Sequence, residues 1–301
     1  MNEIYHIPAL LNETIELLNI NPKGIYIDAT FGGGGHSRSI YDKLNKDGKL
    51  IAFDQDKDAQ ANAWKADNFI LINSNFAYLK NFVEYLELGE VDGILADLGV
   101  STHHIDEPER GFSFRFNAKL DMRMNVYNEL DAYYVVNQYS KEKLTEIFRK
   151  FSDLKNAKQI ANTIDKTRKE KEIKTTFDLV ESIKELAPKK TENKFYAQVF
   201  QAIRIEVNDE METLMSFLEQ STQILKNGGR IAIISYHSME DKLVKNFFKN
   251  GNFEGERITD IYGNQIRPLK PLNKKVIVPA EEEIEKNNRA RSAKLRVAEK
   301  I

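Results

Sequence analysis

Three aspartates in the first third of the chain stand where apolar runs end. Asp28 closes the run Gly24-Ile-Tyr-Ile-Asp, Asp54 closes Lys49-Leu-Ile-Ala-Phe-Asp, and Asp97 closes Val91-Asp-Gly-Ile-Leu-Ala-Asp. Short apolar runs of this kind predict buried strands of a parallel sheet, whose carboxyl ends meet at one edge. A carboxylate at that edge can accept hydrogen bonds from both hydroxyls of a ribose. We therefore expect Asp54 to bind the ribose of a nucleoside-containing ligand.

Four consecutive glycines, Gly32 to Gly35, separate the first strand from a helical segment that opens at Ser37. Without a Cβ these residues adopt positive φ at little cost and let a ligand approach the backbone closely. The dinucleotide fingerprint needs a third glycine where this chain has Ser37 or Arg38, and no Gly-Lys-Ser/Thr follows as in a phosphate-binding loop. A ligand with a ribose but no phosphate, such as S-adenosylmethionine, needs neither signature. A purely structural turn is the alternative interpretation.

The elements that must position these residues follow an alternating rhythm. Apolar runs at residues 24–28, 49–54, 69–73 and 91–97 are separated by helical segments, which predicts a parallel sheet with helices on both faces. The rhythm resumes late: a helical stripe begins at Val207 and ends at Asn227-Gly-Gly229, and residues 230–235 predict another buried strand.

The middle of the chain has a different sequence pattern: residues 107–205 show helical periodicity and no strand-like run. We expect an α/β domain of residues 1–106 and 206–301 interrupted by a helical domain of residues 107–205. An insertion after the fourth strand lies over the ligand-binding edge of such a sheet, which makes it a candidate for substrate recognition. A helical cap without a binding role is the alternative.

The sequence leaves the roles of some further groups open. Asp97 can accept a hydrogen bond from an amine substrate, hold the cofactor, or only cap the next segment. Phe112, Phe114 and Phe116 alternate, which favours one face of a strand over an aromatic platform beside Arg110 and Arg115. After the late strand, Ser238 is expected to cap a helix, with Asp241 at the capping-box position.

Two other clusters concern metals and nucleic acid. His103 and His104 are neighbours and no carboxylate stands near them at metal-ligand spacing, so we expect no metal site. Near the end of the chain, a basic segment begins with Arg289 and Arg291. Its composition predicts a solvated tail, and the alternative is a segment that binds phosphates.

Composition restricts the class of protein. The chain has 301 residues, a formal net charge of -2 and no cysteine, which excludes disulfides and thiolate metal sites and fits a reducing cytoplasm. Because the net charge is negative, any nucleic-acid surface must be local. No apolar run approaches the length that spans a bilayer, so we expect a cytoplasmic protein without membrane contact. The sequence leaves the oligomeric state, a homodimer included, open.

In this order, the motifs resemble those of the MraW family of S-adenosylmethionine-dependent methyltransferases. The resemblance covers nearly the whole chain and rests on His6-Ile-Pro-Ala-Leu-Leu, Asp28-Ala-Thr-Phe-Gly-Gly-Gly-Gly-His-Ser37, Asp97-Leu-Gly-Val-Ser101, Glu109-Arg-Gly-Phe-Ser-Phe114, Leu120-Asp-Met-Arg-Met124, Phe200-Gln-Ala-Ile-Arg-Ile-Glu-Val-Asn208, Ile234-Ser-Tyr-His-Ser-Met-Glu-Asp241 and Arg289-Ala-Arg-Ser-Ala-Lys-Leu-Arg296. It implies a class I, Rossmann-like α/β fold with an inserted helical domain. It also implies methyl transfer to the exocyclic 4-amino group of a cytosine in 16S ribosomal RNA, in the small ribosomal subunit.

The resemblance also implies roles for single residues. Cofactor contacts fall on Gly34, Gly35, His36, Asp54, Phe76, Asp97 and His104, with Phe76 near the adenine and Asp97 near the adenine or the reactive end. His104 stands where the family has a glutamine, and an imidazole cannot both donate and accept from one group as an amide can. Asp97 is the candidate catalytic residue, and Arg110, Arg289 and Arg291 are the candidate RNA-binding residues. A non-catalytic adenosyl-binding module and a nicotinamide oxidoreductase are the competing classes.

Overall fold

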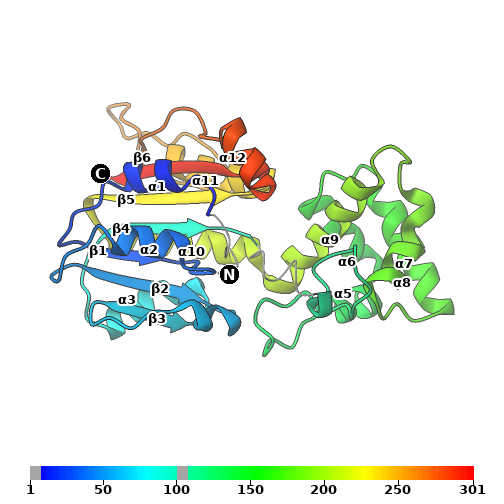
Figure 1. The fold of residues 1–301 in the computed structure, drawn as a ribbon. Coiled ribbons are helices and arrows are strands. Elements are labelled where there is room, and N and C mark those ends of the chain that lie inside the picture. Colours follow the sequence, from blue (N-terminus) through cyan, green and yellow to red (C-terminus); the bar gives the residue numbers. More distant parts are fainter. Residues whose placement is uncertain (1–7, 100–107) are drawn as a thin grey trace. The chain divides into compact units, whose positions relative to one another are not determined.

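A computed structural model describes residues 8–99 and 108–301 of the chain. The chain divides into two compact units, one formed by Met1–Gly99 with Met211–Ile301 and the other by Val100–Glu210. The first contains a sheet flanked by helices, and the second is helical (Figure 1). The helical unit is thus an insertion between the fourth and fifth strands of the sheet.

The sheet has seven strands in the order β3-β2-β1-β4-β5-β7-β6. Their bounds are β1 Ile25–Asp28, β2 Lys49–Asp54, β3 Phe69–Asn73, β4 Val91–Asp97, β5 Leu225–Ser235, β6 Leu269–Pro271 and β7 Lys294–Lys300. β1 to β5 run parallel to one another, whereas β7 is antiparallel to both β5 and β6. The predicted strands of the first half of the chain are confirmed, with Ile25 in place of Gly24 as the first residue of β1.

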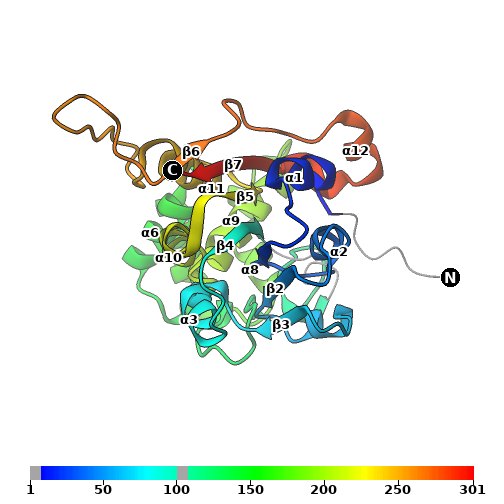
Figure 2. The same ribbon diagram turned by 90° about the vertical axis from the view of Figure 1, so that its left-hand side faces the viewer.

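Side chains that alternate along the strands build a core on each face of the sheet. Ile27, Phe53 and Ile94 pack on one face, and Tyr26, Ala52 and Leu95 on the other. The first face is covered by α3 Leu79–Tyr85, α10 Glu210–Ile224 and α11 Ser238–Asn250, and the second by α1 Leu11–Leu18 and α2 Gly35–Tyr41 (Figure 2). A strand buried on both faces reads as a continuous apolar run, which explains the sequence pattern.

The start of β5 differs from the prediction. Helix α10 ends at Ile224, and the Gly228-Gly229 pair lies inside β5, where the pairing with β4 shifts from Val91–Leu225 to Gly93–Arg230. The glycines therefore form a bulge of the strand and do not end the helix. The stripe predicted from Val207 is also divided between two helices, because Asp209 adopts a left-handed conformation with φ of 49°.

The helical unit consists of amphipathic helices that bury one face each. They are α5 Ala132–Gln138, α6 Lys141–Phe151, α7 Ala157–Glu170, α8 Thr176–Ile183 and α9 Glu192–Asn208. In α6, Leu144, Ile147 and Phe148 are fully buried, and the Ser140 side chain caps the helix by accepting a hydrogen bond from the Lys143 amide.

The aromatic triplet at the start of this unit is not a strand. Phe112–Phe116 is irregular, Phe114 packs against Tyr196 and Phe200, and Phe116 is exposed. Gly111 dictates this path: its φ is +72°, and a Cβ there would lie 2.2 Å from the Lys119 carbonyl oxygen. The alternation of the three phenylalanines therefore did not reflect strand pairing.

The basic segment near the end of the chain is not a solvated tail either. After the short acidic helix α12 Glu281–Lys286, it forms the 3-10 helix η5 Asn288–Ser292 and then β7, which lies inside the sheet. The remaining 3-10 helices are η1 Asp58–Asn62, η2 Phe76–Tyr78, η3 Pro108–Arg110 and η4 Lys184–Leu186. Within the described part of the chain, no helix is long and apolar enough to cross a membrane.

Candidate active site at the carboxyl ends of β1, β2 and β4

The glycine loop connects β1 to α2. Gly32 and Gly34 have φ of +51° and +77°, which favours glycine. A Cβ at Gly34 would lie 2.9 Å from the Phe31 ring and one at Gly35 would lie 2.8 Å from Pro8 Cγ, whereas a Cβ at Gly32 would meet nothing within 4 Å. Packing therefore requires glycine at positions 34 and 35, whereas the backbone is open to approach at Gly32.

Asp54, at the end of β2, is tied to the glycine loop. One carboxylate oxygen accepts a hydrogen bond from the Gly32 amide at 2.8 Å and the other from the Asp56 amide at 2.8 Å. The Asn62 side chain donates to the Gly32 carbonyl at 3.0 Å, which holds the loop from its other side. A carboxylate offers about four lone-pair directions, so this fixed orientation is compatible with further acceptance from ribose hydroxyls.

Asp28, at the end of β1, is buried below the loop. Its two carboxylate oxygens accept hydrogen bonds from the Ser37 hydroxyl at 2.7 Å and the Thr30 amide at 3.1 Å. Burial raises the pKa of Asp28 to about 6, because water no longer stabilises the charge, and the negative charge of Asp54 adds to the effect. Asp28 thus holds the start of α2 against the loop and is fully buried, whereas Asp54 is partly exposed.

Asp97, at the end of β4, is held by groups from three other segments of the chain. Its amide donates to the Thr30 hydroxyl at 2.6 Å, its Oδ1 accepts from the Tyr236 hydroxyl at 2.9 Å, and its Oδ2 lies 3.7 Å from His36 Nδ1. Burial raises the pKa of Asp97 to about 7, and the nearby carboxylates Asp28 and Glu240 act in the same direction. A carboxyl group whose pKa lies near neutral pH is suited to accept a proton at this edge of the sheet.

The Tyr236 hydroxyl is held as a donor by its surroundings. Burial and the adjacent Asp97 raise the pKa of Tyr236, so its proton stays on the phenol. The buried carboxylate of Glu240 accepts a hydrogen bond from the Tyr236 amide at 2.9 Å, which fixes the backbone after β5. Tyr236 was not singled out from the sequence, although it stands in the motif Ile234-Ser-Tyr-His-Ser-Met-Glu-Asp241, on which the resemblance partly rests.

The cap of α11 differs by one residue from the prediction. His237, and not Ser238, is the N-cap: its Nδ1 accepts from the Glu240 amide, and Glu240, and not Asp241, completes the capping box. Asp241 instead accepts two hydrogen bonds from Arg296 on β7, at 2.7 and 3.2 Å. Glu240 takes the capping-box position that was expected for Asp241, and its buried carboxylate accepts hydrogen bonds from the amides of Tyr236 and His237.

His36 and Phe76 line the same edge. His36 is buried at the start of α2, and its Nε2 lies 3.1 Å from the Ala9 carbonyl oxygen, which places the other ring nitrogen toward Asp97. Phe76, in η2 after β3, is half-buried with its ring edge-on to Phe217 at 5.0 Å. The Asn75 side chain donates to Gln55 at 2.9 Å and so joins η2 to the residue that follows Asp54.

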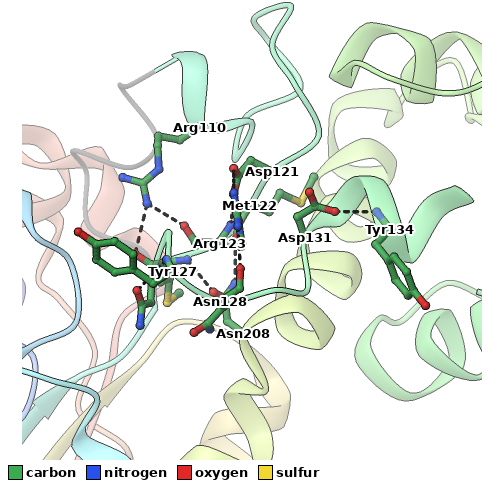
Figure 3. A network of polar contacts seen from close by, with 11 residues as sticks. Arg110, Asp121, Met122, Arg123, Tyr127, Asn128, Asp131, Tyr134 and Asn208 are labelled. Atoms are coloured by element: carbon green, nitrogen blue, oxygen red, sulfur yellow. Dashed lines mark hydrogen bonds and ion pairs between the residues drawn. The ribbon is translucent and has the colours of Figure 1, made fainter. Parts of the chain in front are cut away.

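The remaining predicted residues are His104, Arg110, Arg289 and Arg291. His104 falls outside the described residues. Arg289 and Arg291 are exposed on η5. Arg110 is half-buried in the helical unit, where its guanidinium donates to the carbonyl oxygens of Arg123 and Met124 (Figure 3).

Arg110 belongs to a polar network that shapes residues 110–128 of the helical unit (Figure 3). At its centre, Asn208 accepts from the Met124 amide at 2.7 Å and donates to the carbonyl oxygens of Met122 and Arg204 at 2.8 and 2.9 Å. Met122 itself is fully buried with φ of 59°, a strained conformation for a non-glycine residue. The network therefore holds an unfavourable backbone that presents Tyr127 to solvent.

The site fits S-adenosylmethionine in three respects. Asp54 offers a carboxylate suited to a ribose diol, and Gly32 leaves its backbone approachable. The charge of Asp28 raises the pKa of Asp97, and the charge of Asp54 raises that of Asp28. A neighbouring cation relieves this repulsion, and the sulfonium of S-adenosylmethionine is a cation. A seven-stranded sheet with an antiparallel β7 between β5 and β6, and acids at these strand ends, defines a class I, Rossmann-like S-adenosylmethionine-dependent methyltransferase.

Comparison with known proteins gives the family. The model of the MraW methylase family matches residues 3–301, and the chain belongs to this family. Ribosomal RNA small subunit methyltransferase H of Flavobacterium johnsoniae is 57% identical over 297 residues, which cover 99% of this chain and 98% of that protein. The protein of the same name from Bacteroides fragilis (strain YCH46) is 52% identical over 98% of this chain and 97% of that protein. A solved rRNA methylase from Streptococcus thermophilus aligns with a TM-score of 0.42 and 14% identity, over 97% of this chain and 93% of that one.

Proposed function

We propose that this methyltransferase modifies the exocyclic 4-amino group of a cytosine in 16S ribosomal RNA. The observation that carries the proposal is the family membership together with relatives of 51–57% identity that bear the name ribosomal RNA small subunit methyltransferase H. These relatives match along nearly their whole length, so both units of the fold belong to the shared protein. The proposal implies action in the cytoplasm, where small ribosomal subunits are assembled.

The chemistry asks for a proton acceptor. The lone pair of a cytosine 4-amino group is delocalised into the ring, so the nitrogen must lose a proton as its new bond to carbon forms. S-adenosylmethionine, when bound, supplies the methyl group on a sulfonium whose carbon–sulfur bond breaks. The Asp97 carboxylate, aligned by Thr30 and Tyr236, is the acceptor that we assign to the amine proton. Alignment of the reacting atoms supplies the rest of the rate enhancement.

The same residues fulfil other needs of the reaction. Asp54 and the backbone of Gly32 would hold the cofactor, and Phe76 would lie against its adenine. His36 is proposed as a contact that packs the cofactor pocket between Asp97 and the Ala9 carbonyl. We assign recognition of the RNA to the helical unit and to Arg289 and Arg291. Arg110 would act in that unit by shaping the segment that carries Tyr127.

The test is transfer of a labelled methyl group to small ribosomal subunits from a strain that lacks this enzyme. We expect stoichiometric labelling of small subunits, none of large subunits, and 4-N-methylated cytidine after digestion of the RNA to nucleosides. Label on cytosine C5, on a ribose hydroxyl or on another base would contradict the proposed target while leaving the methyltransferase assignment intact. Asp97→Asn should bind S-adenosylmethionine and yet transfer methyl far more slowly.

A further inference from the structure

Residues 257–275, which we call the edge track, follow the outer edge of the sheet beside β6. The track begins with a hairpin, in which Thr259 pairs with Gln265, and continues through β6 to a bend at Lys274 and Lys275. The hairpin projects away from β6 (Figure 2). The whole edge track contains five basic residues and one acid: Arg257, Arg267, Lys270, Lys274, Lys275 and Asp260.

The hairpin has a defined structure. The Asp260 amide donates to the Asn264 carbonyl oxygen at 2.9 Å, and the Asp260 carboxylate accepts from the amides of Tyr262 and Asn264 at 2.8 Å each. At its base, the Gln265 side chain donates to the Lys249 carbonyl oxygen at 2.7 Å, and so anchors the hairpin to the end of α11. These bonds hold the turn in one conformation, so the exposure of its side chains does not result from fraying of the hairpin.

The tip of this hairpin exposes large apolar side chains. Ile261 is 91% exposed and Tyr262 is 82% exposed, and neither gains stability for the fold from such a position. An ordered turn that leaves an isoleucine and a tyrosine in water fits a contact with a partner. A tyrosine on a basic surface is the combination that stacks on unpaired bases while neighbouring cations neutralise phosphates.

The register of the sheet shows where the track leads. Leu269 pairs with Lys300 and Pro271 with Ala298, whereas Ser235, at the carboxyl end of β5, pairs with Lys294. The hairpin therefore lies at the amino ends of the parallel strands, opposite the acids of the active site. From there the basic residues follow the edge for about 15 Å toward the carboxyl ends of the strands.

We propose that the edge track is a second RNA-binding surface, which holds ribosomal RNA away from the methylated base. The inference rests on the proposed function, since that function makes RNA the substrate, and extends it to a surface outside the catalytic site. Charge decides between RNA and an apolar protein partner: a chain with a net charge of -2 concentrates an excess of four positive charges in 19 residues. The aromatic tip then contributes stacking, and the lysines contribute the electrostatic part.

The experiment measures binding of deproteinised small-subunit RNA over a series of salt concentrations. Tyr262→Ala should raise the Kd by about five- to a hundredfold, the range of one lost stacking contact. Its matched control is Tyr85→Ala, which removes a tyrosine that is 80% exposed on α3 and should leave the Kd unchanged. Lys274→Gln/Lys275→Gln should reduce the slope of log Kd against log salt by about one to two, while Lys43→Gln/Lys46→Gln should not.

Two further measurements make the outcomes distinguishable. Affinity for S-adenosylmethionine and the kcat of methyl transfer at saturating subunits should be unchanged in Tyr262→Ala, because the tip is remote from the site. If Tyr262→Ala weakens binding to intact subunits but not to deproteinised RNA, the partner is a protein and the proposal is wrong. If the wild type methylates small subunits and neither edge-track variant alters binding, the proposal is also wrong. Failure of the wild type to methylate small subunits would instead refute the proposed function.

Discussion

The side chain of Asp54 has two tasks, and its substitution separates them. It faces the predicted position of the ribose and also accepts the Gly32 amide, so its removal both loses a ligand contact and loosens the loop. Asp54→Ala should cost about 1.5–3 kcal/mol of binding free energy for S-adenosylmethionine, or about ten- to a hundredfold in Kd. Asp54→Asn, which keeps one oxygen acceptor, should lose less.

Calorimetric titration with S-adenosylmethionine measures this loss. Asp67→Ala is the matched control, because it removes an exposed carboxylate before β3, away from the site. An unchanged Kd in a folded Asp54→Ala protein would remove Asp54 from the cofactor site.

Asp97 makes activity depend on pH with a definite sign. The groups that face it are Asp28 from β1, His36 from α2, Tyr236 after β5 and Glu240 from α11. Because burial raises its pKa to about 7, the Asp97 carboxylate, which we propose as the acceptor of the amine proton, is protonated below neutral pH and ionised above it. We expect kcat/KM for the RNA to rise with pH through about 7.

Tyr236→Phe tests the origin of this limb. The tyrosine hydroxyl donates to the ionised form of Asp97 and so lowers its pKa; without it, the rising limb should move up by about one pH unit or more. Asp97→Asn should remove the limb altogether. If Tyr236→Phe lowers kcat equally at every pH, the tyrosine supports only packing. His104→Gln tests a second source of pH dependence. Protonation of a histidine near the cofactor would weaken the binding of S-adenosylmethionine in the same acidic range, and the glutamine variant should lack that effect.

At the scale of the element, the end of α9 shows how a helix terminus holds a neighbouring segment in place. Asn208, the last residue of α9, satisfies both the amide of Met124 and the carbonyl oxygen of Met122 and thereby stabilises a left-handed methionine. Asn208→Ala leaves these buried groups without a partner and should lower the free energy of unfolding by about 1–3 kcal/mol. It should also reduce the hydrogen-exchange protection of the Met124 amide.

Asn128→Ala is the control for that experiment. Asn128 lies in the same network but takes part through its backbone. Its carbonyl oxygen accepts from Arg123 at 2.7 Å and its amide donates to the Asn125 carbonyl oxygen at 3.1 Å, and both groups survive the substitution. Equal unfolding midpoints for the Asn208→Ala and Asn128→Ala proteins would show that the asparagine at the end of α9 is dispensable for the loop.

At the scale of the whole molecule, charge is distributed so that a protein with more acids than bases can meet a polyanion. Arg289 and Arg291 are exposed on η5, whereas Arg296 forms two hydrogen bonds with Asp241 inside the fold. Arg289→Gln/Arg291→Gln should weaken RNA binding and reduce its salt slope by about one to two, with an unchanged Kd for S-adenosylmethionine. Filter binding across a salt series measures this.

Arg296→Gln should behave in the opposite way. Loss of its hydrogen bonds to Asp241 should lower stability, by about 1.5–3 kcal/mol, and leave the salt slope as it was. A salt slope that drops for Arg296→Gln but not for Arg289→Gln/Arg291→Gln would place the RNA on a different side of β7.

Local patterns in the sequence determined the parallel strands, the acids at their ends, the glycine turn and the existence of a helical insertion. These features follow from apolar periodicity and from the conformational freedom of glycine, which act over a few residues. The interpretation failed at the bulge of β5, at the aromatic triplet and at the basic C-terminal strand, because partners far away in the chain decided those conformations. Tyr196 and Phe200 pack against Phe114 from more than 80 residues away, and β5 and β6 pair with β7, which the sequence predicted to be a charged tail.

The site shows the same division. Asp54 and Asp97 could be proposed from their positions at strand ends, but the environment that places the pKa of Asp97 near neutrality comes from elements that are distant in sequence. Tyr236 meets Asp97 across 139 residues, and Thr30 meets its amide across 67. Hydrogen bonds and desolvation depend on which groups share a small volume, and only the packing of β1, β4, α2 and α11 around that volume decides them.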